Sequence, residues 1–299
     1  MNRRHFLRTA LSLAVLNACS SNKPPSLLVP PPPLLRPKIA LALGGGAAKG
    51  FAHIGVIKTL EAQGITVDIV TGTSAGSVVG SLYAAGYNGF QLQTLAQQLD
   101  ESNLRDLTLS TQGFIKGEKL QDFINQQVGN RPIEQLKLPF GAVATDLDNG
   151  KRIVFRVGNT GQAVRASCSI PNIFLPVTIR GRRYVDGGLS SPVPVSAALE
   201  MQADFVIAVD ISSKARNGSP TGFLSLLDQS ITIMGERLLN AELAHADVVI
   251  RPAVANLGAA DFDARHTAIL EGERATLAAI PLIKQKIVAK SQALTQGRP

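Results

Sequence analysis

Ser74 stands at the centre of the stretch Gly-Thr-Ser-Ala-Gly, residues 72–76, and a serine in this pattern can attack a carbonyl carbon. A sharp turn from a strand into a helix strains the central residue and pushes its hydroxyl outward, so Gly72 and Gly76 must be small. The same turn places the hydroxyl at a helix N-terminus, where unpaired N–H groups favour a developing negative charge. The pattern therefore predicts acyl transfer at Ser74, with Gly72 and Gly76 forming a nucleophile elbow.

A nucleophilic serine needs a base that accepts its proton, and Asp186, in the stretch Tyr-Val-Asp-Gly-Gly, is a candidate. Taken alone, an aspartate before two glycines indicates a turn. Together with Ser74 it could form one half of a Ser-Asp dyad. A late histidine, His245 or His266, would instead complete the Ser, Asp, His order of an α/β-hydrolase triad, so this alternative esterase stays open.

The glycine-rich stretch at residues 44–50, GGGAAKG, does not fit a phosphate-binding loop, because no Ser or Thr follows its lysine. Its glycine spacing is imperfect for a dinucleotide-binding turn, although Asp68 lies where a ribose-binding acid could stand, so nucleotide binding remains an alternative. The loop could instead aim backbone N–H groups at an oxyanion, for which Gly45 and Gly46 are suited because no side chain blocks the approach. Lys49 is expected to orient this loop or to attract a lipid phosphate.

Short apolar stretches alternate with helical patterns along the chain, and both glycine-rich turns follow such a stretch. This alternation predicts an α/β fold, a three-layer sandwich in which helices cover both faces of a largely parallel central sheet. Ligands of such sheets bind beyond the carboxyl ends of the strands, where both turns fall. The expected strands are residues 38–43, 67–71, 140–144, 152–157, 180–183 and 205–210, and the expected later helices are 91–99, 119–128, 195–201, 224–246 and 264–290.

The composition of the 299 residues, with 45% hydrophobic and 17% charged, is that of a globular protein. Two cysteines cannot build a disulfide scaffold or a four-thiolate zinc site, and the four histidines show no metal-ligand spacing. The formal net charge is +8, but residues 1–37 contain five of the cations and no acid. The rest of the chain is nearly balanced and shows no basic stripe, so a nucleic-acid partner is not expected.

Residues 1–19 have the features of a signal peptide: a basic start, a short apolar stretch at residues 9–18 and the ending Leu-Asn-Ala-Cys. Ten helical residues rise about 15 Å, too little for a hydrocarbon core of about 30 Å. The start resembles the twin-arginine export signal, and the ending resembles the lipobox of bacterial lipoproteins, which would lipidate Cys19. Residues 20–37 are proline-rich and predict a semi-rigid tether. We therefore expect an exported protein of the bacterial cell envelope, anchored through Cys19 to a membrane and facing the periplasm.

Four ordered motifs carry a resemblance to a known family: GGGAAKGFAHIGVIKTLEAQGI, GTSAGS, ASCSIPNIFLPV and YVDGGLSSPVPV. Together they resemble the patatin-like phospholipase family in its small bacterial branch, from about residue 38 to at least residue 210. The resemblance implies Ser74 as nucleophile and Asp186 as base in a dyad without histidine. It also implies an oxyanion hole at Gly45, Gly46 and Ala47, because an alanine amide still donates where the family often has glycine. Lys49 stands where the family usually has arginine and keeps the charge without the bidentate fork.

The resemblance thus implies a patatin-like hydrolase domain over residues 38–299, with the motifs in 38–210 and a helical C-terminal part in 211–299. The expected activity is that of a serine lipid acyl hydrolase, a phospholipase, lysophospholipase or esterase, with membrane lipids as substrate and no metal or organic cofactor. The alternative from another class is a non-catalytic, lipid-binding envelope protein of the same fold. The sequence leaves the oligomeric state open.

Overall fold

A computed structural model describes residues 34–98, 116–212, 223–258 and 261–297. The predicted signal peptide with Cys19, and residues 20–33 of the predicted tether, lie outside these described residues. Among the described helices, none combines the length and apolarity needed to cross a membrane.

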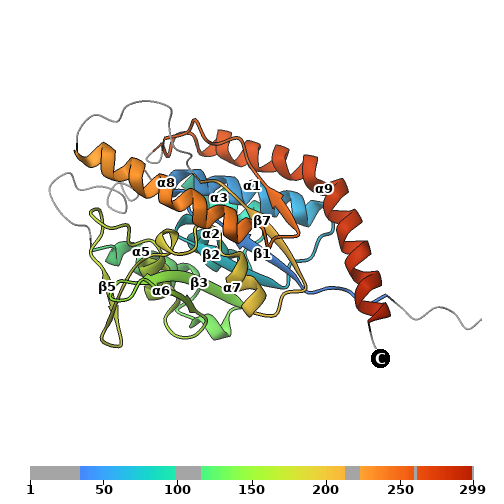
Figure 1. The fold of residues 1–299 in the computed structure, drawn as a ribbon, viewed down its shortest axis with the longest axis horizontal. Coiled ribbons are helices and arrows are strands. Elements are labelled where there is room, and N and C mark those ends of the chain that lie inside the picture. The colour runs from blue at the N-terminus through green and yellow to red at the C-terminus, as the bar shows by residue number, and fades with distance from the viewer. Residues whose placement is uncertain (1–33, 99–115, 213–222, 259–260, 298–299) are drawn as a thin grey trace, which may run out of the picture. The chain divides into compact units, whose positions relative to one another are not determined.

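The described strands form one sheet whose order is β5-β6-β3-β2-β1-β7-β8, with β4 paired to β3 outside this path (Figure 1). The middle and one edge, β3-β2-β1-β7-β8, are parallel, and the pairs made by β4, β5 and β6 are antiparallel. The largely parallel sheet predicted from the sequence is therefore confirmed. The strands are β1 (Ile39–Leu43), β2 (Ile69–Thr73), β3 (Phe140–Asp146), β4 (Arg152–Phe155), β5 (Val177–Ile179), β6 (Arg182–Asp186), β7 (Phe205–Val209) and β8 (Val248–Ile250).

Helices cover both faces of the sheet, which confirms the three-layer architecture. Successive residues of β1 point to opposite faces. Leu41 and Leu43 pack with α1, α2, α3, α5 and α9, whereas Ala40 and Ala42 pack with α7 and α8. The helices are α1 (Ala52–Ala62), α2 (Ala75–Ala85), α3 (Gly89–Gln98), α5 (Glu118–Gln127), α6 (Thr160–Ser167), α7 (Val195–Glu200), α8 (Phe223–Leu243) and α9 (Arg265–Gln296), and the 3-10 turns are η1 (Ala47–Phe51), η2 (Ile133–Gln135) and η3 (Gly187–Leu189).

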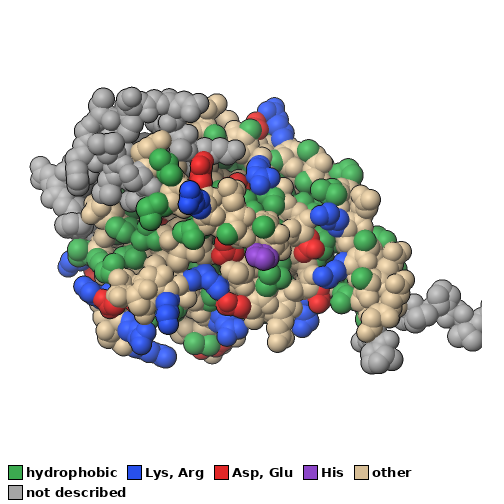
Figure 2. Space-filling view, viewed as in Figure 1, with side chains coloured by type: hydrophobic (Ala, Val, Ile, Leu, Met, Phe, Trp, Pro, Cys, Tyr) green, Lys and Arg blue, Asp and Glu red, His purple; other side chains and the backbone are tan. Residues whose placement is uncertain are grey.

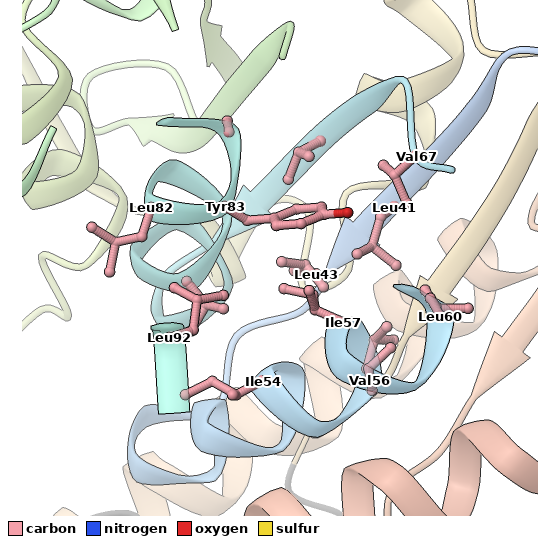
Figure 3. Packing of buried hydrophobic residues seen from close by; sticks show 14 of the residues in the cluster. Leu41, Leu43, Ile54, Val56, Ile57, Leu60, Val67, Leu82, Tyr83 and Leu92 are labelled. Atoms are coloured by element: carbon pink, nitrogen blue, oxygen red, sulfur yellow. The ribbon is translucent and has the colours of Figure 1, made fainter. Parts of the chain in front are cut away.

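The larger core lies between the sheet and α1, α2 and α9. Figure 3 shows side chains of α1 and α2 converging on Leu41 and Leu43 of β1. α1 and α9 cross at two glycines, because a Cβ at Gly55 would lie 2.0 Å from the carbonyl oxygen of Ile269 and one at Gly272 would lie 2.0 Å from that of Ala52. The first helix of the domain is therefore held between the sheet and the last helix.

Several element bounds differ from those predicted. β2 lies two residues later than expected and runs directly into Ser74, and β6 begins at Arg182 because Arg180 and Gly181 form a turn with positive φ. β5, β8 and α6 were not predicted. The two strands have only three residues each, too few for a hydrophobic period to stand out.

Candidate active site

Ser74 lies at the turn between β2 and α2 with a backbone φ of 52° and ψ of −123°. A positive φ is strained for a residue with a side chain and marks a site that the surrounding structure holds in place. The turn is possible because the residues two positions before and after Ser74, Gly72 and Gly76, lack side chains. A Cβ at Gly72 would lie 2.4 Å from the carbonyl oxygen of Gly76, and a Cβ at Gly76 would lie 2.1 Å from that of Leu43. Gly72 and Gly76 thus allow the sharp turn at Ser74, and their role in a nucleophile elbow stays a prediction.

β3 brings Ser74 and Asp186 together, because both β2 and β6 pair with it. One side of β3 is occupied by β4, so β2 and β6 share the other side, β6 continuing where β2 stops. Thr73, the last residue of β2, pairs with Val143, and Asp186, the last residue of β6, pairs with the next residue, Ala144. The nucleophile and the carboxylate, more than a hundred residues apart in sequence, therefore meet above the end of β2.

The carboxyl group of Asp186 is buried, with 7% of the residue exposed, as is Ser74. Its Oδ1 accepts the N–H of Gly188 at 2.7 Å, and its Oδ2 has no hydrogen-bond partner among the described residues. Burial raises the pKa of Asp186 to about 6, while the Gly188 N–H and the Ser74 hydroxyl act in the opposite direction. Ser74 thus influences the carboxyl without completing a bond to Oδ2, as is common in catalytic pairs without substrate.

The backbone of Asp186 is fixed on both sides. Its N–H donates to the carbonyl of Ser169 at 2.9 Å, and its carbonyl accepts the hydroxyl of Thr145 at 2.8 Å. The adjacent Gly187 comes so close to β3 that a Cβ there would lie 2.2 Å from the carbonyl oxygen of Val143. Gly187 therefore serves close packing against β3 as well as the turn.

The glycine loop lies against the elbow. A Cβ at Gly45 would lie 3.3 Å from the Cβ of Ser74, and one at Gly50 would lie 2.6 Å from the Cβ of Ala75. The amide of Gly45 donates to the carbonyl of Pro192 at 3.0 Å, whereas the amides of Gly46 and Ala47 have no hydrogen bond within the described chain. Of the three residues expected at the oxyanion hole, Gly45 thus supplies space beside Ser74, and the other two keep a donor available.

Two further residues of this loop have distinctive surroundings. Ala47 has a φ of 52°, a conformation that glycine adopts more easily than alanine. Lys49 is buried on η1 rather than displayed on the surface. Its expected role toward a lipid phosphate or in orienting the loop stays a prediction.

Three residues that sequence analysis did not single out also surround Ser74. The Ser74 amide donates to the hydroxyl of Ser167 at 2.9 Å, and that hydroxyl donates to the carbonyl of Val143 at 2.5 Å. Cys168 follows on the same segment, where burial and the charge of Asp186 raise the pKa of its thiol to about 12. The hydroxyl of Thr73 donates to the carbonyl of Ser191 at 2.8 Å. Ser167 and Cys168 lie inside the motif ASCSIP, which could have signalled them.

The histidines differ sharply in their surroundings. His53 on α1 is fully buried, and its Nε2 lies 2.8 Å from the carbonyl oxygen of Gly44, to which it donates. Burial lowers the pKa of His53 to about 4, so its ring is neutral near pH 7. His245 and His266 are exposed, and no hydrogen bond joins either side chain to Ser74 or Asp186 within the described residues. Neither exposed histidine is thus joined to the pair in this structure, and the dyad stays a prediction.

The surface combines charges of both signs with apolar groups. Figure 2 shows Lys and Arg side chains interspersed with Asp and Glu on the face that it displays. α8, on the side of the sheet that carries α7, exposes the apolar side chains of Ile233, Met234 and Leu238.

A family model described as Patatin-like phospholipase matches residues 41–199, more than half of the chain and all the residues of the proposed dyad and glycine loop. The chain belongs to the patatin-like phospholipase family. Among curated proteins, this patatin-like chain is 40% identical over 189 residues to an uncharacterized NTE family protein of Mycobacterium bovis, covering 62% of this chain and 51% of that protein. The chain thus spans about half the length of this relative.

Two relatives of the patatin-like chain carry names that state or suggest an activity. A lysophospholipase NTE1 of Meyerozyma guilliermondii is 33% identical over 181 residues, 58% of this chain and 13% of that protein. Patatin-like phospholipase domain-containing protein 6 of the mouse is 35% identical over 184 residues, 59% of this chain and 14% of that protein. Among solved structures, VipD from Legionella pneumophila superposes with a TM-score of 0.50 at 13% identity, covering 84% of this chain and 67% of that one, which is a likeness of fold.

Proposed function

We propose that this protein is a serine hydrolase of lipid acyl esters that uses a Ser74–Asp186 dyad. The observation that carries the proposal is the position of the strained Ser74 beside a buried carboxyl group whose Oδ2 has no hydrogen-bond partner among the described residues. Such a carboxylate is available to accept the proton of the serine hydroxyl. The family and the names of the relatives support a lipid ester as the substrate class.

In the first half of the reaction, the Ser74 oxygen attacks the ester carbonyl carbon while its proton moves to Asp186. The resulting oxyanion accepts hydrogen bonds from the amides of Gly46 and Ala47, and the α2 N-terminus favours its charge. Collapse of this intermediate breaks the bond to the alcohol oxygen, and Asp186 returns the proton to that alcohol as it leaves.

In the second half, water attacks the acyl group held on Ser74, again losing a proton to Asp186. The bond between acyl carbon and Ser74 oxygen breaks, the proton returns to Ser74, and a free fatty acid is released. A pKa of about 6 suits both steps, because Asp186 is charged near pH 7 yet holds a proton more readily than an ordinary aspartate.

The exposed apolar side chains on α8 support a substrate that belongs to a lipid surface. A test uses liposomes of mixed phospholipids and lysophospholipids, incubated with wild type and with Ser74→Ala, followed by mass spectrometry of the lipids. We expect fatty acid release with wild type only, and the spectra identify head group and acyl position. Equal spectra for both proteins contradict hydrolysis of these lipids.

A serine-reactive fluorophosphonate probe separates the enzyme from a non-catalytic lipid-binding protein of the same fold. We expect the probe to label folded wild type at Ser74, and to label neither Ser74→Ala nor Asp186→Asn. Labelling lost in His245→Leu or His266→Leu to the same degree would instead favour the triad. Absence of labelling in folded wild type, with retained lipid binding, identifies the non-catalytic alternative.

We also propose that the protein is exported and lipid-anchored in the bacterial envelope through Cys19. The basic start, the short apolar stretch and the Leu-Asn-Ala-Cys ending in residues 1–19 support this. Metabolic labelling with a clickable fatty acid tests it. Wild type should incorporate the label and Cys19→Ala should not, with Cys168→Ala as the matched control that keeps it. Label retained in Cys19→Ala contradicts the anchor.

A further inference from the structure

Glu242 is a buried carboxylate on α8, far in sequence from every motif that predicted the site. The residue is 9% exposed. Its Oε1 accepts the hydroxyl of Ser191 at 2.5 Å and that of Ser196 at 2.7 Å, and its Oε2 accepts the backbone N–H of Ser196 at 2.7 Å. These three donors all belong to residues 191–196, the segment that follows η3 and ends in the first two residues of α7.

The segment 191–196 accepts hydrogen bonds from residues that surround the candidate site. Its Pro192 carbonyl accepts the amide of Gly45, which lies beside Ser74. Its Ser191 carbonyl accepts the hydroxyl of Thr73, the residue before Ser74. Its Pro194 carbonyl accepts the hydroxyl of Thr71 on the same strand. Through these hydrogen bonds the segment connects the glycine loop to β2, the strand that ends just before Ser74.

We infer that Glu242 is a positioning residue for catalysis, which fixes segment 191–196 and through it the glycine loop beside Ser74. The inference rests on the proposed function for its kinetic consequence. Its structural basis is that the carboxylate of Glu242 accepts the hydroxyls of both Ser191 and Ser196. These two serines flank Pro192 and Pro194, whose carbonyls accept hydrogen bonds from Gly45 and Thr71. Displacing the segment by a fraction of an ångström moves Gly45 relative to Ser74, and small misplacements of reacting groups lower rates steeply.

Two variants of equal size separate hydrogen bonding from charge and volume. In Glu242→Gln, the amide oxygen can keep the Ser196 N–H, and both serine hydroxyls can turn to accept from the new NH₂ group. In Glu242→Met, the three donors lose their acceptor in a buried place. We expect Glu242→Gln to stay within about threefold of wild type and Glu242→Met to lose about tenfold to hundredfold in kcat on a soluble short-chain ester, with KM little changed.

Asp247→Ala is the matched control. Asp247 follows α8 and its Oδ2 accepts the backbone N–H of Val206 at 2.8 Å, so its loss also removes an acceptor from a backbone donor. Val206 lies at the start of β7, whereas the site lies beyond the end of that strand, where Val209 accepts the amide of Gly44. We expect Asp247→Ala to lower the unfolding temperature without lowering kcat at temperatures where it stays folded.

A second readout does not depend on activity. Hydrogen exchange of the Gly45 amide, followed by NMR or mass spectrometry of full-length protein, reports its bond to Pro192. We expect faster exchange at Gly45 in Glu242→Met than in wild type, Glu242→Gln or Asp247→Ala. If Gly45 exchange and kcat are unchanged in folded Glu242→Met, the inference is overturned. A wild type that hydrolyses no ester but shows the exchange pattern overturns the proposed function, and leaves supported only that Glu242 fixes the glycine loop through segment 191–196.

Discussion

Gly45 approaches Ser74 so closely that a Cβ on Gly45 would lie 3.3 Å from the Cβ of Ser74. This contact joins the two glycine-rich motifs in space, because Gly45 follows β1 and Ser74 follows β2, its parallel neighbour. The size of the side chain at position 45 therefore limits the positions that the Ser74 side chain can adopt.

Gly45→Ala should lower kcat about tenfold while the protein stays folded, because Ser74 or the loop must shift by a few tenths of an ångström. Ester hydrolysis with circular dichroism as the folding check measures this. Gly235→Ala is the control, since nothing lies within 4 Å of a Cβ there and alanine favours a helix. An active Gly45→Ala enzyme with wild-type kcat would show that the contact is not tight.

His53→Leu should lower both stability and kcat, because the Gly44 carbonyl loses its donor in a buried place, at a cost of about 1–3 kcal/mol. His53→Gln should recover part of both, since its side-chain amide can donate. Urea unfolding and steady-state kinetics measure the two effects. The exposed His245 and His266 serve as controls, and leucine at either should leave both quantities near wild type.

Activity should fall on the acid side of about pH 6, because burial raises the pKa of Asp186 to that value and the protonated carboxyl cannot act as a base. The measurement is kcat/KM against pH, and we expect a tenfold loss per unit at pH values well below 6. An acid limb near pH 4 would mean that the base is not Asp186 in this buried state.

Asp186→Asn should be inactive and more stable than wild type at pH 7. The pKa of Asp186 is higher in the folded protein than the ordinary 3.8, so the stability of wild type decreases as pH rises from about 4 to 6. A shift of about two units corresponds to at most about 3 kcal/mol. Denaturant unfolding should show the advantage of Asp186→Asn above pH 6 and its disappearance near pH 4.

Ala47→Gly should keep full activity and gain up to about 1 kcal/mol of stability, because φ is +52° at this position and glycine adopts such values without strain. Ala47→Val should be strongly destabilised, since a branched Cβ is disfavoured there. Urea midpoints for the three proteins give the ranking Gly, Ala, Val. Any other order would indicate that the loop relaxes away from this conformation.

The sequence predicted Ser74 from the glycines on either side of it in a turn, and Asp186 only in combination with Ser74 and the family resemblance, because an aspartate before two glycines by itself indicates a turn. The parallel sheet followed from alternating apolar and helical stretches. The engaged amide of Gly45 could not be foreseen, because its acceptor, Pro192, is almost 150 residues away and only the fold brings it there. Glu242 could not be predicted either, because its partners are also distant in sequence and an acid in a helix normally indicates a solvated face.

The crossing of α1 and α9 at Gly55 and Gly272 has a consequence for biosynthesis. Ribosomes add about 5–20 residues per second, so the roughly 200 residues between these helices take about 10–40 s to make. Ser74 and then Asp186 are added during that time, and both are in the chain before α9, which covers the outer side of α1, has been made. The packing around α1 can therefore be completed only once α9 has been synthesised, so the fold that holds Ser74 forms late in the synthesis of this domain.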